Sequence, residues 1–220
     1  MKKEIKICLP LYKIVYSVFF VAVLSLIRGV GSTFEIGVTL EPLMALLAAV
    51  FCADTYVQEI ASKRSEVGQL YPMKNRLASI LRRMAVQEAY LLVLAAAGYG
   101  LFLIVQKPIL FYGTRYGEWS MFGGYLAAIV VTLIFWGMLS HTLSCLFRTM
   151  WAGIGGCLIV WILTNSTTGE QLFGKWNLFS YTFRTIEDSR DMDWLCGKLV
   201  CLVLCMVMAG MLPRIMRRRG

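Results

Sequence analysis

The chain alternates between long runs of hydrophobic residues and short stretches that hold most of its charge. An α-helix needs about 20 apolar residues to cross the hydrocarbon core of a bilayer. The pattern predicts an all-α integral membrane protein with a single transmembrane domain, residues 1–220. Its six transmembrane helices are expected at Lys13–Ile27, Thr39–Ile60, Ala85–Val105, Met121–Phe147, Met150–Leu163 and Trp194–Leu212.

Composition narrows the class of protein further. Of the 220 residues, 58% are hydrophobic and 16% are charged, whereas soluble domains have roughly 45–50% apolar and 25% charged residues. Six spans would use about 120 residues, so the remainder forms termini, loops and surface helices. This arithmetic leaves no room for a soluble catalytic domain of the usual size.

Lysine and arginine residues predict the orientation, because positively charged loops resist translocation. With six spans, both termini share one side with the segment between spans two and three, and that side holds 15 of the 22 basic residues. Both termini are therefore expected in the cytoplasm, in a multi-pass protein of the cell membrane, of the bacterial cytoplasmic type. The net charge of +9 is a topology signal and does not indicate a nucleic-acid partner.

The first 12 residues contain a second, shorter pattern. Ile5, Cys8, Leu9 and Tyr12 recur at helical spacing, while three lysines point elsewhere. This spacing predicts an N-terminal helix over residues 1–12 that lies in the cytoplasmic interface of the bilayer. A frayed basic tail is the alternative.

The longest cytoplasmic segment, Gln58–Met84, carries two apolar stripes separated by Gly68 and Pro72. Each stripe has the i, i+3, i+4 spacing of an amphipathic helix. We therefore expect two short helices joined by a turn. Resting on the lipid headgroups and docking to a cytosolic protein are both compatible with this pattern.

This segment also carries a family resemblance. It resembles the E…(K/R)xExGxLxxxP stretch after the second span in type-2 permeases of ATP-binding cassette exporters, and the predicted spans and termini are similar to that family along essentially the whole chain. Gln69 departs from the small residue expected after the glycine, and Arg82 or Arg83 replaces a lysine before the third span. The matching residues are Glu59, Lys63, Arg64, Glu66, Gly68, Leu70 and Pro72.

The resemblance implies a transport subunit that does not itself catalyse a reaction. It implies a dimer with a second permease copy or paralogue, each permease contacting a separate ATPase subunit that binds ATP and magnesium, with no cofactor in this chain. The exported substrate would be hydrophobic or amphipathic, with a peptide favoured over a lipid or a drug. The residues that would couple to the ATPase are Glu59, Arg64, Glu66, Gly68, Leu70, Pro72 and Arg76.

The predicted outer segment, residues 165–193, is rich in aromatic residues, which favour the membrane interface. In the resembling family this region forms short helices that cap the translocation path, and an ordinary aromatic belt is the equal alternative. The stretch Gly169–Lys175 matches seven positions of a phosphate-binding loop, but Trp176 replaces the residue that holds magnesium. We therefore expect no nucleotide site in this chain.

Ionisable residues inside spans are candidates for function, because they are costly to place there. Asp54 is the candidate for the substrate pathway. Glu59 can pair with Lys63, and Glu88 is expected to reach Arg82, Arg83 or a neighbouring helix. His141, the single histidine, is interpreted as a packing residue.

Small residues predict where helices approach closely. Ser25 with Gly29 and Ala152 with Gly156 are the dimer-interface candidates, since the resembling family dimerises through its first and fifth spans. Packing within one chain would leave the same pattern. The seven cysteines lack metal-ligand spacing, so no metal or catalytic residue is assigned. An intramembrane enzyme using His141 or a cysteine, and a structural anchor or sensor, are the alternatives to transport.

Overall fold

The computed structural model describes residues 8–61, 73–109, 118–183 and 192–219, which are almost entirely helical. Side chains at residues 54, 56–61, 73–76 and 217–219 lie outside the description. Within the described residues, the β contact is a single parallel bridge between Ser32 and Ile109. The helices are α2 (Leu11–Ile27), α3 (Thr33–Ala61), α5 (Met73–Gln106), α6 (Glu118–Phe147), α7 (Met150–Thr164), α8 (Thr167–Phe173), the 3-10 helix η1 (Gly174–Trp176) and α9 (Trp194–Arg219).

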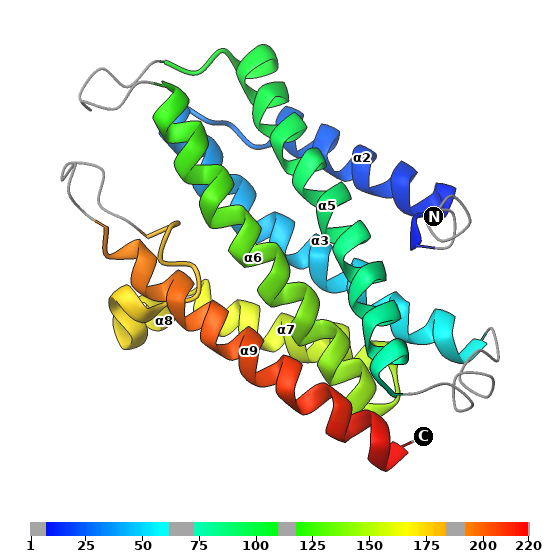
Figure 1. The fold of residues 1–220 in the computed structure, drawn as a ribbon. Helices are drawn as coiled ribbons and strands as arrows, with labels where there is room; N and C mark the ends of the chain where they lie inside the picture. Colours follow the sequence, from blue (N-terminus) through cyan, green and yellow to red (C-terminus); the bar gives the residue numbers. More distant parts are fainter. Residues whose placement is uncertain (1–7, 62–72, 110–117, 184–191, 220) are drawn as a thin grey trace.

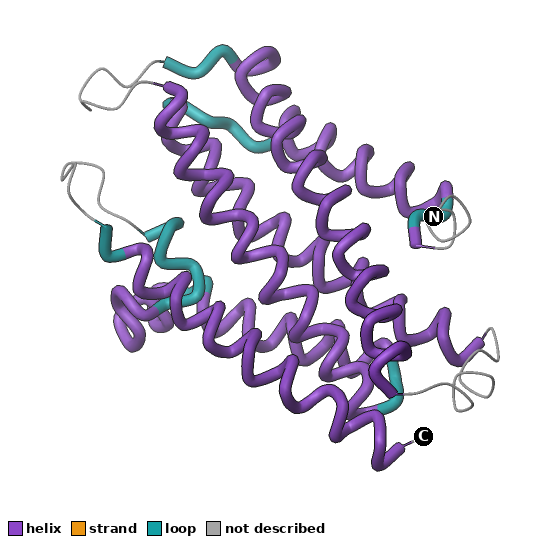
Figure 2. Tube along the Cα trace, viewed as in Figure 1, coloured by secondary structure: helices purple, strands orange, loops and turns teal. Residues whose placement is uncertain are grey.

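The long helices form an elongated bundle around α3 and α6 (Figures 1 and 2). Helices α5 and α7 each contact both α3 and α6, α2 packs on α5, and α9 packs on α6. One end of the bundle, which we call the terminal end, holds the start of α2, the ends of α3, α6 and α9, and the start of α5. The opposite end, the α8 end, carries α8, η1 and the start of α9.

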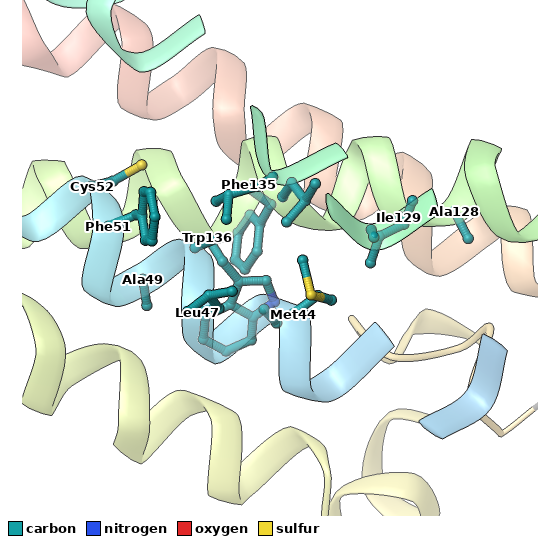
Figure 3. Close-up of a cluster of buried hydrophobic side chains, with 14 of the residues drawn as sticks. Met44, Leu47, Ala49, Phe51, Cys52, Ala128, Ile129, Phe135 and Trp136 are labelled. Atoms are coloured by element: carbon teal, nitrogen blue, oxygen red, sulfur yellow. The ribbon is translucent and has the colours of Figure 1, made fainter. Parts of the chain in front are cut away.

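Helix α3 is buried on nearly all sides, because its apolar residues occupy every face of the helix. Ile36, Leu40 and Met44 follow one another at intervals of four and are each 0% exposed. They meet α6, whose Phe135 and Trp136 pack edge to face with ring centroids 5.5 Å apart. Figure 3 shows Trp136 beside Leu47 and Met44 of α3. The centre of the core is therefore the contact between α3 and α6.

Four helices are long and apolar enough to cross a membrane: Thr33–Ala53, Leu77–Gln106, Trp119–Phe147 and Trp194–Met216. A fifth span exists if α7 is counted together with α8 and η1, which continue it after a bend of 75°. These helices indicate a multi-pass membrane protein. The predicted first span, α2, has 17 residues and is about 26 Å long, slightly less than the hydrocarbon core of about 30 Å.

Two local expectations differ from the structure. Residues Leu77–Met84 do not form a separate short helix but belong to α5, which runs unbroken for 34 residues because no proline or glycine interrupts it before Gly98. The first helix begins at Leu11 rather than Lys13, directly after Pro10. Residues 1–7 of the predicted interfacial helix and residues 62–72 of the predicted coupling segment lie outside the described residues.

The contact between α6 and α7 depends on glycine. A Cβ atom built on Gly153 would lie 2.0 Å from the Ser144 Oγ and 2.7 Å from the Ser140 backbone oxygen. One built on Gly156 would lie 2.7 Å from the Leu143 Cδ1. The side of α7 that carries these two glycines therefore packs on α6 of the same chain.

Gly153→Ala should destabilise the protein by about 1–3 kcal/mol, since the added methyl group has to push α7 away from α6. Gly155→Ala is the matched control on the same helix, because nothing lies within 4 Å of its Cβ position. The control should be neutral or stabilising by up to roughly 1 kcal/mol, as alanine favours helix. Melting temperatures of the two purified variants in detergent test this, and equal values would contradict close packing at Gly153.

Candidate functional site

A buried ion pair joins α3 to α9 within the apolar bundle. The Lys198 Nζ donates a hydrogen bond to the Glu41 Oε1, and the two residues are 3% and 0% exposed. Charges inside spans are rare and costly. A buried pair is tolerated only when further hydrogen bonds satisfy the remaining lone pairs and protons.

Both members of the pair have further polar contacts. The Lys198 Nζ also donates to the Thr132 Oγ1 at 2.8 Å and to the Leu178 backbone oxygen at 2.9 Å. The Thr132 Oγ1 donates to the Glu41 Oε1 at 2.8 Å, and the Thr182 Oγ1 donates to the Glu41 Oε2 at 2.9 Å. The cluster of Glu41, Thr132, Thr182 and Lys198, which we call the charge clasp, links three helices to the turn after η1.

That turn, residues 177–183, is held against the bundle by polar contacts. The Asn177 Nδ2 donates to the Thr164 oxygen at 2.9 Å, and the Asn177 Oδ1 accepts from the Phe179 amide at 3.0 Å. The Ser180 Oγ donates to the Trp194 oxygen at 2.7 Å. Helix α9 passes so close that a Cβ on Gly197 would lie 2.0 Å from the Asn177 oxygen. Gly197 therefore permits the approach that puts Lys198 into the clasp.

Aromatic side chains of the same turn point into the protein. Phe179 is 0% exposed and stacks on Trp136 of α6, with centroids 5.5 Å apart. Tyr181 is 1% exposed and meets Trp194 edge to face at 5.4 Å. These two residues therefore do not form an outward aromatic belt. Trp176, 53% exposed, is free to meet an interface.

A hollow of about 480 Å³ lies at the α8 end. Its walls combine side chains of both charges with aromatic rings, and they are formed by Glu170, Gln171, Gly174, Lys175, Ser180, Phe183, Asp193 and Trp194. Gly169 belongs to α8, so the stretch that resembles a phosphate-binding loop is helical and follows a helix rather than a strand. A phosphate-binding loop follows a strand, so the local structure of this stretch differs from that motif.

The terminal end has its own buried polar contacts around α3. The Lys13 Nζ donates to the Phe51 oxygen at 3.0 Å and lies 5.1 Å from the centroid of the Phe51 ring. The Thr55 Oγ1 donates to the Gln87 Oε1 at 2.9 Å, and the Gln87 Nε2 donates to the Cys8 oxygen at 3.2 Å. Buried lysines therefore contact α3 near both of its ends.

His141 is 0% exposed in α6. Its Nε2 lies 3.5 Å from the Cys145 Sγ, and its Nδ1 has no hydrogen-bond partner in the described part of the chain. The searched residues contain no group of three or more His, Cys, Asp or Glu side chains arranged to hold a metal ion. Of the alternatives predicted for Glu88, the described residues show no ion pair with Arg82 or Arg83, which are six and five positions away and off the i, i+4 alignment. The Glu88 carboxyl instead approaches the neighbouring helix α6 at Gly137.

The sequence-predicted site residues fall into separate places. Ser25 is buried, with its Oγ donating to the Ala22 oxygen at 2.8 Å, while Gly29 is exposed and Ala152 is half-buried. Gly156 packs on Leu143. Asp54 and Glu59 lie in α3 and Arg76 lies in α5, with side chains outside the description. The remaining coupling residues, Arg64, Glu66, Gly68, Leu70 and Pro72, lie outside the described residues.

The clasp itself was missed from the sequence. Glu41, which lies two residues after the expected start of the second span at Thr39, has no role assigned from the sequence. Lys198 falls within the predicted sixth span. An unpaired lysine in an apolar span was the signal, since such a residue requires an acidic partner.

Lys198→Met should destabilise the protein by about 3–5 kcal/mol, because it leaves the Glu41 carboxylate buried without a cation. Adding Glu41→Gln should recover part of that loss, since the amide is neutral. Lys175→Met, at an exposed position of η1, is the control and should change stability by about 0.5 kcal/mol or less. Thermal unfolding of the native protein, Lys198→Met, Glu41→Gln, the double variant and the Lys175→Met control measures the coupling, and additive effects of the two clasp substitutions would contradict the ion pair.

Comparisons were made with protein families, with characterised proteins and with solved structures. None of the three gives a match to this chain. The charge clasp and the polar contacts at the terminal end are therefore described from their own residues.

Proposed function

We propose that this chain is the membrane-spanning permease subunit of an ATP-binding cassette exporter. The proposal rests on the E…(K/R)xExGxLxxxP resemblance of residues 59–72. The observation that carries it furthest is the position of this segment: the end of α3 and the start of α5, which flank it, lie at the terminal end together with the start of α2 and the end of α9 (Figure 1). In the proposed topology, 15 of the 22 basic residues lie on the same side of the membrane as this segment.

In the proposed topology, six spans place the terminal end in the cytoplasm. The short α2 serves as the first span, and α7 serves as the fifth, with α8 and η1 turned back at the outer side. The two short spans would be accommodated by local thinning of the bilayer or by contact with a second permease. Gly29 and Ala152 remain the proposed dimer contacts, whereas Ser25 is buried and Gly156 packs on Leu143 within the chain. Asp54 remains the proposed pathway residue.

The proposed mechanism is alternating access driven by ATP hydrolysis in a partner subunit. Movement of the ATPase would act on the segment around Glu66 and Gly68, next to the start of α5. At the other end, the charge clasp fixes the turn after η1 to three helices, so opening the outer side requires this turn or its helices to move together. The substrate proposed is a hydrophobic or amphipathic molecule, with a peptide favoured and a lipid or drug as alternatives.

A second candidate, an intramembrane enzyme, is favoured by the 3.5 Å contact between the His141 Nε2 and the Cys145 Sγ. A thiol beside an imidazole is the arrangement of a cysteine nucleophile and its base. In such enzymes a third group orients the base, and none is found for the Nδ1 among the described residues. Transport therefore remains the better-supported proposal.

Labelling with a membrane-impermeant maleimide tests the topology. Lys175→Cys, exposed in η1, should react in intact cells, whereas Ala78→Cys, exposed in α5, should react only after permeabilisation. The unsubstituted chain gives the background from the native cysteines. The reverse pattern would contradict a cytoplasmic terminal end.

Affinity purification of the chain should recover an ATPase of the ATP-binding cassette type. Gly68→Val should weaken that association or uncouple ATP hydrolysis from transport, because a bulky side chain blocks a sharp turn or close backbone approach. Glu66→Arg should do the same by reversing a charge. Gly210→Ala, at an open position of α9, is the control for expression and insertion. Normal ATPase association and transport by both coupling variants would contradict the coupling role.

A further inference from the structure

Glu88 is an acidic residue near the middle of α5, inside the candidate span Leu77–Gln106. A Cβ built on Gly137 of α6 would lie 3.0 Å from the Glu88 Oε1 and 2.9 Å from the Cys52 Sγ of α3. The carboxyl oxygen and the thiol sulfur are therefore within about 6 Å of each other. Gly137 permits both groups to approach α6 this closely, because a side chain at this position would collide with them.

The carboxyl group of Glu88 has no hydrogen bond or ion pair in the described part of the chain, and the residue is half-buried. Glu41, which is also an interior acid among the described side chains, contrasts with it, because Lys198, Thr132 and Thr182 all donate to that carboxylate. Both acids lie among apolar helices, but only the Glu41 carboxylate has hydrogen-bond donors among the described residues.

The charged and titratable groups that face Glu88 come from every helix around it. Cys52 of α3 is acted on by the charges of both Glu88 and Lys13 of α2, and Cys205 of α9 is also acted on by Glu88. Lys13 has its Nζ directed to the Phe51 oxygen, 3.0 Å away. None of these groups gives Glu88 a direct ion pair.

His141 provides a second, independent observation. It lies one helical turn from Gly137 on α6, a rise of about 6 Å, and its buried Nδ1 has no partner among the described residues. Buried polar atoms in proteins are almost always hydrogen-bonded. The His141 Nδ1 and the Glu88 carboxyl, neither of which has a hydrogen-bond partner among the described residues, therefore lie near adjoining turns of α6, at His141 and at Gly137.

An ionised carboxylate without a cation is expensive inside a span, and a buried acid commonly avoids this cost by taking up a proton. The described residues around Glu88 do not form a metal-ligand group, and the room beside Gly137 is too small for a methyl group. We propose that Glu88 is a proton-binding site, held as a neutral carboxyl between α3, α6 and α9 and deprotonated when this region admits water. The proposal does not depend on the transport function.

Dicyclohexylcarbodiimide tests the proposal on the full-length protein in membranes, because it reacts with protonated carboxyl groups in apolar surroundings. The acid O–H adds across one C=N bond of the reagent: the carboxyl oxygen bonds to the central carbon and the proton goes to nitrogen. Migration of the acyl group from oxygen to nitrogen then gives a stable N-acylurea, with no other reactant consumed. Peptide mass spectrometry locates the adduct.

Glu88 should be labelled in mildly acidic buffer, and the labelling rate should fall by roughly tenfold for each pH unit above the titration midpoint, as the protonated fraction does. Glu41, which is ion-paired, is the internal control and should stay unlabelled. Gly137→Ala, whose methyl group would crowd the carboxyl, should lower labelling of Glu88 several-fold, and Glu88→Gln should abolish it.

Three results would overturn the proposal: no adduct on Glu88 in the acidic buffer, labelling that does not change with pH, or equal labelling of Glu41 and Glu88. Each result is measured on the protein with its native sequence, so none requires a substituted variant to fold. Gel filtration of the labelled protein in detergent shows that the measured population is folded.

Discussion

The charge of Glu41 has to be neutralised inside an apolar bundle, and the arrangement of the α8 end follows from how this is done. Lys198 reaches Glu41 only because α9 lies against the turn of residues 177–183, and that approach requires Gly197. The same turn supplies the Leu178 oxygen and the Thr182 hydroxyl. A single electrostatic requirement therefore determines where α9, α6, α3 and the turn meet.

The two acidic residues of the interior illustrate two solutions to one physical problem. Glu41 is matched by a cation and two hydroxyl groups, so its charge is compatible with a closed structure. Glu88 has a thiol nearby and no cation paired with it among the described residues, so its neutral form is the one compatible with the same structure. The first carboxyl stabilises one arrangement of helices, whereas the second makes the arrangement sensitive to the presence of water.

Much of the helical framework could be predicted from the sequence, because apolar runs and the residues that interrupt them are local signals. All six predicted spans are helical, although four, or five with the bent pair, have the length and hydropathy of a crossing. The clasp could not be located in the same way, since Glu41 and Lys198 are 157 positions apart. Their pairing depends on tertiary packing, and only the need of each charge for a partner was visible. The aromatic residues Phe179 and Tyr181 show the same limit, because composition alone does not distinguish an inward ring from an interfacial one.

Helix α5 has a mechanical consequence. With 34 residues and no break, it is about 51 Å long. A displacement at Met73 therefore moves the whole helix as one rigid body. At the far end, the Gln106 side chain binds the Ser25 and Arg28 oxygens at 2.6 Å and accepts from the Val30 amide at 2.7 Å, while Ile109 pairs with Ser32. A displacement of the start of α5 would therefore also displace the connection between α2 and α3 at the opposite end of the helix, because no break in α5 separates the two.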